Sequence, residues 1–566
     1  GKTNLVIQTL NESIKTDQDN VLSISLLGTF LAMNEEYEEA IKFQKLAVEK
    51  APFEIPFYLN LSETLNQINM LEESLSTLYF AKVLSLNDKS IDYKLAKIHT
   101  KLKNYFKADL IYKDLIKEDI VASEIIHDYC NNLIRSSKAK EAILFLEKYE
   151  LKKPKDEKVK VIIGFAYYYI KQYKTAKNIL LEVTKSNNYN EQALTILGNC
   201  HEELGDLDQA KNYYNQTLKI NPNNVEAINH LATCYFYNGN TNQAMDLYNL
   251  SLTINNDNSN TRYFLSLCQL AQSSYKQGWL NFESRWLAIG FNSVKLKSNL
   301  PKFKIDMDKK NLLLWGEQGV GDQILFLRFL KNIKPYVNNL FIKIDKRLHP
   351  LINRFCSGII FFDKDVNLNL DAQLPLGDLP SLFVKDNSYF LNNKNYYLSS
   401  DPKIKKKLEV NIKSKNKFLC GISWISNVEE IGSNKSITLE TLKPILKIEN
   451  IEFVDLQYTE TLIERENFYN KNNIKIKKLE NIDNFNDLNG LISLIDVCDF
   501  VITISNTNAH ISGSIGKKTF LLLPKGKGRL WYWISNKRRS VWYPKIDVIE
   551  QEQGGDWQPV IKKLQK

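Results

Sequence analysis

The chain has 566 residues, of which 43% are hydrophobic and 25% charged, and its formal net charge is +10. This composition suits a folded protein with room for more than one domain, and it argues against disorder. No uninterrupted apolar run reaches the length of about 18 residues that spans a bilayer, and no secretory signal pattern opens the chain. We therefore expect a cytoplasmic protein without a membrane span.

The charge and the cysteines exclude two further classes of protein. Lys, Asn and Ile are frequent along the whole chain, and there is no helix-turn-helix, zinc finger or aromatic RNP-like strand, so a nucleic-acid partner is not expected. The seven cysteines form no CxxC pair or Cys/His cluster, which favours a reducing compartment and gives no metal site. Cys200, Cys234 and Cys268 are 34 residues apart and are predicted to be packing residues.

The first half of the chain repeats with a period of 34 residues. One series of small residues consists of Ala40, Ser74, Ala108, Ala142, Ala176, Ala210 and Ala244. A second series stands 12 residues ahead of it and consists of Gly28, Ser62, Ala96, Cys130, Gly164, Gly198 and Ala232. Two small positions per unit predict two helices in close contact, and this pattern resembles the tetratricopeptide repeat (TPR).

The resemblance predicts a TPR superhelix over residues 1–290. Each unit cannot bury its apolar face alone, so the units stack and form a groove that commonly holds an extended peptide. The chain lacks an initiating Met, and residues 1–20 are expected to be the second helix of an earlier unit, which indicates a trimmed start. Bulky aromatic residues replace the repeat pattern between Gly278 and Trp286, which predicts a closing cap.

The second half changes to short apolar runs followed by helical segments. This alternation predicts parallel sheets and two Rossmann-like halves. We place a connector at 291–310, the first half at 311–402, a lysine-rich linker at 403–417 and the second half at 418–566.

A glycine-containing turn follows the first predicted strand. The strand at Leu312–Trp315 leads into Gly319, Gly321 and Asp322, and a helix is predicted to begin at Gln323. Glycines permit a tight turn and close backbone approach, and a helix start offers unpaired N–H groups. Asp322 is a candidate catalytic residue at the rim of an interdomain cleft, and the alternative is an ordinary helix N-cap.

A second candidate site follows the predicted strand Asp499–Ile504. Ser505, Asn506 and Thr507 can cap the next helix, whose amides then face the carboxyl end of the sheet, where ligands of such sheets bind. This arrangement predicts a cradle for a diphosphate, and the alternative is a well-capped helix with His510 in a polar niche. A basic cluster follows, with a solvated loop as its alternative, and consists of Lys525, Lys527, Arg529, Lys537, Arg538 and Arg539.

An ordered set of short segments carries a resemblance that spans nearly the whole chain. The segments are Gly278–Trp279, Glu283–Trp286, Trp315–Ile324, Asp371–Pro380, Gly421–Trp424, Lys435–Leu439, Asp455–Gln457 and Ile504–His510. Together they resemble bacterial TPR glycosyltransferases, whose catalytic part is similar to the heptosyltransferases.

The resemblance implies a GT-B fold that binds an acceptor in its first half and a nucleotide-sugar donor in its second. It implies inverting transfer without a metal or other cofactor, with Asp322 as the general base and Lys435 facing the donor phosphates. It also implies that the donor loops and the glycine turn hold further site residues, namely Gly319, Gly321, Ser423, Trp424, Gln457, Ser505, Asn506, Thr507 and His510. Asn506 stands where the family usually has Asp, and Ile425–Asn427 stands where it often has Gly-Asn-Pro.

Three functions stay open at this point. The first is a glycosyltransferase that modifies a side chain, with O-linkage favoured, on a protein such as flagellin held by the repeats. The second is a heptosyltransferase-like enzyme with a lipopolysaccharide or other glycan acceptor, and the third is a non-catalytic TPR adaptor. A rival metal-binding DxD pattern at Asp363 and Asp365, with another at Asp306 and Asp308, has no evident ligand partners.

Overall fold

The computed structural model describes residues 2–117, 121–150, 156–307, 309–362, 369–392, 396–414, 416–428, 431–533 and 539–565. It divides into two compact units, Gly1–Leu204 and Gly205–Lys566. Several residues singled out from the sequence lie outside the described residues, namely Asp308, Asp363, Asp365, Lys537 and Arg538.

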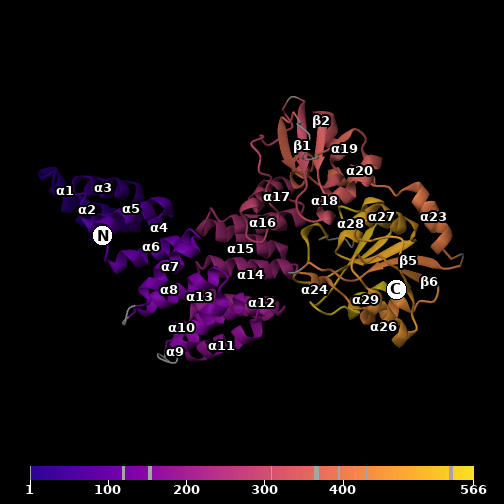
Figure 1. Ribbon diagram of the computed structural model, residues 1–566, viewed down its shortest axis with the longest axis horizontal. Coiled ribbons are helices and arrows are strands. Elements are labelled where there is room, and N and C mark those ends of the chain that lie inside the picture. The colour runs from indigo at the N-terminus through magenta and orange to yellow at the C-terminus, as the bar shows by residue number, and fades with distance from the viewer. Residues whose placement is uncertain are drawn as a thin grey trace. The chain divides into compact units, whose positions relative to one another are not determined.

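The first unit is built from antiparallel helix pairs, coloured indigo to purple in Figure 1. Its helices are α1 (Lys2–Thr16), α2 (Val21–Met33), α3 (Tyr37–Lys50), α4 (Ile55–Gln67), α5 (Leu71–Leu84), α6 (Lys89–Lys101), α7 (Tyr105–Leu115), α8 (Ser123–Arg135), α9 (Ala139–Glu150), α10 (Glu157–Tyr169), α11 (Tyr173–Ser186) and α12 (Glu191–Glu203). The turn inside each pair needs one residue with a left-handed backbone, and these residues again recur every 34 positions: Glu35, Asn69, Lys103, Ser137 and Lys171.

The small residues of the two series lie where the paired helices touch, as the period predicts. The Ser62 and Ser74 hydroxyls, one from each series, are 2.8 Å apart. A Cβ on Gly28 would come within 2.7 Å of Gln44, and a Cβ on Gly164 within 2.6 Å of Leu180. The repeat prediction is therefore confirmed at the level of side-chain contacts.

The second unit starts with further helix pairs and then changes to α/β structure. Its leading helices are α13 (Leu207–Ile220), α14 (Val225–Tyr237), α15 (Thr241–Ile254), α16 (Ser259–Ala271) and α17 (Tyr275–Phe282), followed by the 3-10 turn η1 (Glu283–Leu287). Aromatic rings join this end of the repeats to the α/β part. The ring centroids of Trp279 and Trp531 are 5.6 Å apart, and those of Trp286 and Trp315 are 5.3 Å apart.

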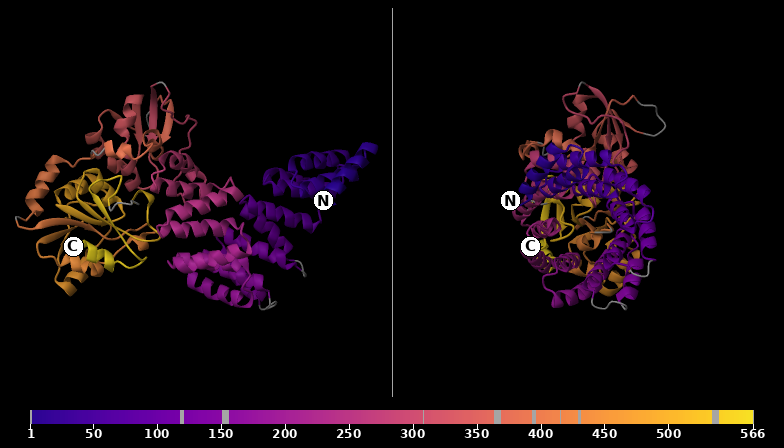
Figure 2. Two further views of the ribbon diagram at one scale, coloured as in Figure 1. Left: turned by 180° about the vertical axis from the view of Figure 1, so that it is seen from behind. Right: turned by 90° about the vertical axis from the view of Figure 1, so that its left-hand side faces the viewer.

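The described strands form two parallel sheets, which Figure 2 shows as separate groups flanked by helices. The first sheet has the order β3-β2-β1-β4, with β1 (Lys310–Trp315), β2 (Val337–Lys343), β3 (Ile359–Phe361) and β4 (Ala372–Pro375). The second has the order β10-β9-β8-β5-β6-β7, with β5 (Phe418–Ser423), β6 (Ile451–Asp455), β7 (Ile476–Lys477), β8 (Phe500–Ile504), β9 (Thr519–Leu523) and β10 (Ile546–Glu550). The predicted parallel α/β region is thus confirmed.

Both sheets reverse their strand order at one internal position. In the second sheet this position lies between β5 and β8, as in doubly wound dinucleotide-binding sheets, and in the first it lies between β1 and β4. We call the carboxyl ends of β1 and β4 the first switch point, and those of β5 and β8 the second switch point. Ligands of doubly wound sheets bind at such positions.

Helices and 3-10 turns connect the strands. They are α18 (Val320–Leu327), α19 (Leu330–Ile333), η2 (Lys334–Tyr336), η3 (Lys346–Leu348), α20 (His349–Phe355), η4 (Leu376–Asp378), α21 (Leu379–Phe383), α22 (Ser388–Asn392), α23 (Pro402–Ile412), α24 (Gly432–Lys435), α25 (Leu439–Leu446), α26 (Leu462–Asn472), α27 (Leu488–Val497), α28 (Thr507–Ser514), η5 (Trp531–Trp533) and α29 (Gln558–Leu564). The lysine-rich linker is largely helical, since α23 spans most of it. The domain boundaries drawn from the sequence stay predictions.

One predicted helix start is wrong. Helix α18 begins at Val320 with Gly319 as its N-cap residue, three residues before the predicted start at Gln323. The glycine-containing sequence continues straight into helical backbone, so Asp322 lies within the first turn of α18 and is not the cap.

Candidate functional site

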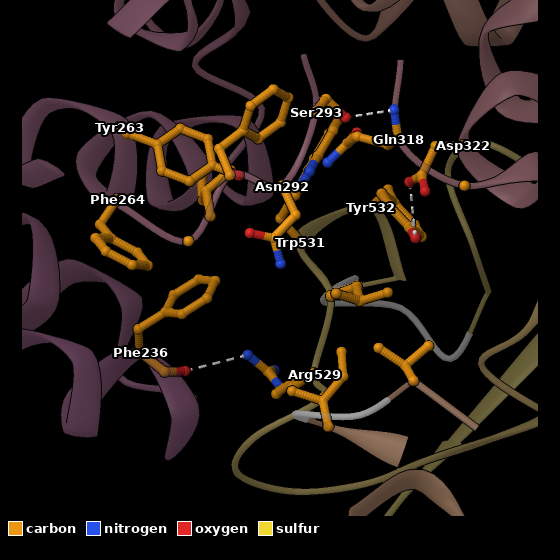
Figure 3. A pocket seen from close by; sticks show the side chains of 18 of the residues that line it. Phe236, Tyr263, Phe264, Asn292, Ser293, Gln318, Asp322, Arg529, Trp531 and Tyr532 are labelled. Atoms are coloured by element: carbon orange, nitrogen blue, oxygen red, sulfur yellow. Dashed lines mark hydrogen bonds between the residues drawn. The ribbon is translucent and has the colours of Figure 1, made fainter. Parts of the chain in front are cut away.

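The turn after β1 presents Asp322 at the first switch point. Gln318 adopts a left-handed backbone with φ of 59°, and its N–H donates to Ser293 Oγ at 2.7 Å. The turn then passes through Gly319 into α18. Asp322 is half-buried on the first turn of this helix, and Figure 3 shows its carboxylate directed toward Tyr532.

The carboxylate of Asp322 has two partners from the second half of the α/β region. The Tyr532 hydroxyl donates to Asp322 Oδ1 at 3.3 Å. Burial raises the pKa of Asp322, while the positive charge of Lys435 and the Tyr532 hydrogen bond oppose that rise. A carboxylate with a raised pKa is suited to accept a proton near neutral pH.

Lys435 ends α24 and is only 4% exposed. Burial lowers the pKa of its ammonium group to about 8, and the charge of Asp322 opposes that fall. Gly528 makes room for the lysine stem, because a Cβ there would lie 2.9 Å from Lys435 Cγ and the residue has φ of +94°. Among the described residues, Lys435 has no ion pair or hydrogen bond from its ammonium group.

Asp322, Lys435 and Gly319 line one cavity of about 560 Å³ (Figure 3). Its remaining walls come from the last repeats, the connector and the loop after β9, and they are strongly aromatic. The cavity is lined by Phe236, Tyr237, Tyr263, Phe264, Phe282, Phe291, Asn292, Ser293, Gln318, Phe326, Val428, Ile431, Gly528, Arg529, Trp531 and Tyr532 as well as Thr233, Leu267, Gly290 and Leu530. This volume lies within the usual range for sites of small molecules.

At the second switch point, the side chains of Ser423 and Asn506 form a hydrogen bond. Asn506 Nδ2 donates to Ser423 Oγ at 2.7 Å, and Ser423 Oγ lies 2.8 Å from Thr503 Oγ1. Asn506 Oδ1 also accepts the N–H of Asn508 at 3.0 Å, so Asn506 is the N-cap of α28. Its amide both donates and accepts, and it joins the ends of β5 and β8 to the helix start.

Gln457 and Trp424 shape the loop after β5. Gln457 is fully buried, and its Oε1 accepts the N–H groups of Trp424 at 2.8 Å and Ile425 at 3.0 Å. Its Nε2 donates to the carbonyl oxygen of Ile425 at 3.1 Å and to Thr459 Oγ1 at 3.3 Å. Trp424 is also fully buried, and its indole N–H donates to Glu464. Both side chains form hydrogen bonds inside the protein. Nothing in the structure tests whether they also contact a donor, so that contact stays a prediction.

The other predicted residues of the second candidate site follow β8 and belong to the start of α28. Ser505 Oγ accepts the indole N–H of Trp533 at 2.9 Å, and Thr507 is the half-buried first residue of α28. His510 lies among aromatic rings, and its Nδ1 is 3.1 Å from the Tyr543 hydroxyl. Burial, reinforced by the charge of Lys435, lowers the pKa of His510 to about 3, so its ring is neutral.

Gly321 lets α18 approach α28. A Cβ on Gly321 would lie 2.8 Å from His510 Cδ2. The two candidate sites drawn from the sequence are therefore adjacent, with His510 packed against the turn of helix that carries Asp322.

Sequence reasoning singled out the basic residues of the loop that follows β9 but missed its aromatic residues, of which Trp531 and Tyr532 line the cavity. Within the predicted basic cluster, Arg529 pairs with Glu550 and Arg539 lies 3.3 Å from Asp547. Arg529 and Tyr532 nevertheless line the cavity. The signal in the sequence is the run of aromatic residues at 531–533, directly after the glycines and basic residues of this loop.

Two structural tests concern the described residues alone. No helix in the described ranges combines the length and apolar character needed to cross a bilayer. Those ranges also contain no group of three or more His, Cys, Asp or Glu side chains placed to hold a metal ion.

Comparison with known proteins identifies the repeats. The family described as "Psidin, N-terminal TPR repeats region" matches residues 131–263, so the amino-terminal part of the chain is a TPR-like solenoid. The curated Protein FlbA of Caulobacter vibrioides is 24% identical over 330 residues, covering 52% of this chain and 52% of FlbA. The chain thus spans about half the length of the curated relative that it matches.

Two solved structures of repeat proteins align with parts of the chain. A tetratricopeptide repeat protein from Parabacteroides merdae has 14% identity and a TM-score of 0.39, covering 46% of this chain and 99% of its own. TTC0263, a TPR protein of Thermus thermophilus, has 16% identity and a TM-score of 0.31, covering 32% of this chain and 100% of its own. With the family match and the two sheets, the chain is a TPR-like repeat protein that continues into a parallel-sheet α/β region.

Proposed function

We propose that this protein is an inverting, metal-independent glycosyltransferase of GT-B architecture, which moves a sugar from a nucleotide-sugar donor to a hydroxyl group of a protein acceptor held by the TPR array. The observation that carries the proposal is the shared cavity of Asp322 and Lys435. A half-buried carboxylate and a buried lysine face one space beside the switch points of two parallel sheets.

The reaction requires a base on the acceptor side. Asp322 takes the proton of the acceptor hydroxyl as its oxygen attacks the anomeric carbon of the donor sugar. The bond between that carbon and the phosphate oxygen breaks, and the nucleotide leaves with the electron pair. The raised pKa of Asp322 supports this role, because a base works best when its pKa approaches the working pH.

The reaction also requires stabilisation of the leaving phosphate. Lys435 supplies a cation on the donor side, and the amino-terminal turn of α28 at the second switch point supplies the positive end of the helix dipole. Preorganised groups of this kind are worth about 3–4 kcal/mol each where oxyanion contacts have been tested.

The repeats support a protein acceptor. Stacked TPR units form extended concave surfaces that bind peptides and proteins, and the family comparison supports such units here. The weak similarity to Protein FlbA does not indicate an activity for this chain. O-linked transfer to Ser or Thr fits a base that removes a hydroxyl proton.

A glycan acceptor is the second candidate, and the cavity walls favour it. Phe236, Tyr263, Phe264, Trp531 and Tyr532 offer flat apolar faces beside a few polar groups. Such walls can stack on the apolar faces of sugar rings. Transfer to free oligosaccharides in the absence of protein would select this candidate, and nucleotide binding without any transfer would favour the adaptor.

The first test is donor binding. We would measure the thermal stability of the protein with nucleoside diphosphates, CMP and their sugar conjugates, since a ligand at about 100 times its Kd adds about 2.7 kcal/mol. We expect one base to stabilise the protein selectively and Lys435→Ala to abolish the effect. Lys517→Ala is the matched control, because Lys517 is a half-buried lysine of the second sheet that bonds to the carbonyls of Asp496 and Cys498. No response to any nucleotide would overturn the proposal.

A further inference from the structure

A buried group of charged side chains lies behind the turn that carries Asp322. Arg285 is fully buried, and its Nε and Nη2 donate to the two carboxylate oxygens of Glu317 at 3.2 and 3.1 Å. Arg285 Nη2 also donates to Asp378 Oδ1 at 2.6 Å, and Lys302 Nζ lies 2.9 Å from Asp378 Oδ2. Lys302 is exposed and also pairs with Glu283, so the buried part of the group is one cation, Arg285, between two carboxylates.

The members of this group come from separate parts of the chain. Arg285 lies in η1, at the end of the repeats, whereas Glu317 follows β1 and Asp378 follows β4. Since β1 and β4 are neighbours, Arg285 fastens the end of the repeats to both strands of the first switch point.

The surrounding structure fits the guanidinium closely. Arg285 lies 4.5 Å from the ring centroids of both Phe282 and Trp286, and its Nη1 donates to the carbonyl oxygen of Phe282 at 3.1 Å. A Cβ on Gly377 would lie 1.7 Å from Glu317 Oε1, so any side chain at this position would push the Glu317 carboxylate from its place. Glu317 has no room to move away from Arg285 on that side.

The arrangement defines where Asp322 can lie. The Glu317 side chain is anchored inward by Arg285, and the next residue, Gln318, is anchored by its N–H to Ser293 Oγ. The following residue, Gly319, is the N-cap of α18, and Asp322 lies on the first turn of that helix. One anchor, Arg285, comes from the end of the repeats, and the other, Ser293, comes from the connector that follows them.

Net stability is a weak explanation for such a group. Desolvating the three buried charges of Arg285, Glu317 and Asp378 costs much of what their attraction returns, and apolar replacements of buried ion pairs are often neutral or stabilising. Burial raises the pKa of Glu317 to about 7 even though Arg285 opposes the rise, which reflects that desolvation cost. The bidentate hydrogen bonds of an arginine guanidinium are directional, so they fix the position of the carboxylate more closely than apolar packing does.

We propose that Arg285 is a positioning residue for Asp322, acting through the bidentate bond to Glu317 and the bond to Asp378. This inference rests on the proposed function, because it makes the end of the TPR array part of the support for the catalytic base. Displacement of a catalytic group by about 1 Å can cost 100-fold in rate. The bidentate bond of Arg285 to Glu317 therefore matters more for turnover than for folding.

The primary test compares Arg285→Lys and Glu317→Gln with wild type. We expect kcat to fall by about 10- to 100-fold, with the KM for the donor nearly unchanged, since the donor phosphates face the second switch point. Asp496→Asn is the matched control, because Asp496 pairs with Lys405 and Lys517 near the amino end of β8. It should lower Tm and leave kcat unchanged, and an equal loss of kcat in this control would overturn the proposal.

A triple replacement separates positioning from stability. Arg285→Met with Glu317→Leu and Asp378→Asn removes the buried charges together, and we expect Tm to recover relative to the single variants while kcat stays low. Recovery of kcat together with Tm would overturn the proposal.

Amide hydrogen exchange gives a readout that needs no activity. We expect Arg285→Lys to lower the protection of residues 318–323 and to leave residues 507–514 unchanged. Unchanged protection of 318–323 would overturn the positioning role. If wild type transfers no sugar from any donor, the proposed function fails, and the exchange experiment still decides whether Arg285 orders the turn.

Discussion

The two switch points use polar side chains in opposite ways. At the first, Asp322 reaches into the cavity, and the ion pairs that support it lie behind the turn. At the second, Ser423, Gln457 and Asn506 form their hydrogen bonds with one another and with the local backbone. The first switch point therefore presents a carboxylate side chain to the cavity, whereas the side chains of the second are engaged internally and Lys435 beside it lines the cavity. A polar residue at the end of a strand can therefore either line a cavity or form hydrogen bonds inside the protein, and its position alone does not indicate ligand contact.

The sharpest test of this contrast is Asp322→Asn. The amide is isosteric but cannot accept the acceptor proton, so we expect transfer to fall by about 100- to 10,000-fold. Nucleotide binding should persist, because the proposed function assigns the donor phosphates to Lys435 and not to Asp322. Asp345→Asn is the control, since Asp345 follows β2 at the same edge of the sheet but forms its ion pair with Arg347. Transfer at the wild-type rate in Asp322→Asn would show that Asp322 is not the general base.

Gln457→Ala tests whether the second switch point depends on internal bonds. The variant leaves the N–H groups of Trp424 and Ile425 without their acceptor, and each unsatisfied buried group costs about 1–3 kcal/mol. We expect the free energy of unfolding to fall by about 3 kcal/mol, measured by denaturant titration. Gln551→Ala, which removes one bond to the N–H of Lys525, should cost less. Lost donor affinity with unchanged stability would instead give Gln457 a direct ligand contact.

The glycine turn provides a matched pair of alanine variants. A Cβ on Gly321 would lie 2.8 Å from His510, whereas on Gly319 the nearest atom would be Asp322 Oδ2 at 3.6 Å. We expect Gly321→Ala to destabilise the protein by about 1–3 kcal/mol through overpacking, and Gly319→Ala to have little effect on Tm. Equal effects of the two substitutions would show that α18 and α28 do not need this close approach.

The repeats and the sheets could be predicted from the sequence because each depends on local periodicity. The 34-residue period located the paired small residues, and the alternation of strands and helices indicated parallel pairing. The candidate base was found for the same reason, since Asp322 follows a strand and a glycine turn. Strand ends and helix starts are properties of short segments.

The surroundings of these residues depend on contacts between distant segments. Tyr532 bonds to Asp322 across 210 positions of sequence, and Arg285 meets Asp378 across 93. No local pattern reports such contacts. The hydrogen bonds of Gln457 to the loop after β5 could likewise not be predicted from the sequence. Residue type gives the capacity to bond, and only the fold determines the partner.

Lys435, beside the second switch point, predicts a loss of rate at high pH, whereas Asp322 at the first predicts a loss at low pH. Because burial lowers the pKa of Lys435 to about 8, its charge is lost as the pH rises through that value. We expect kcat/KM to fall roughly tenfold for each pH unit above it, as the phosphate loses its counter-charge. Lys435→Arg should keep the charge and remove this fall, since arginine stays protonated. A fall that persists in Lys435→Arg would assign the basic limb to another group.

The smallest expected effect concerns the bond between the two halves at Asp322. The neutral Tyr532 hydroxyl donates to Asp322 Oδ1 and thereby lowers the pKa of the carboxyl group. Tyr532→Phe should raise that pKa further, so the acidic limb of kcat/KM should move to higher pH and transfer near pH 7 should fall by about fivefold or less, the worth of one hydrogen bond of about 1 kcal/mol. Tyr543→Phe is the control, because Tyr543 bonds to His510 and Tyr397 and not to Asp322. Movement of the limb to lower pH in Tyr532→Phe would mean that the hydroxyl supports the protonated carboxyl, and the first switch point would then present an acid where a base is required.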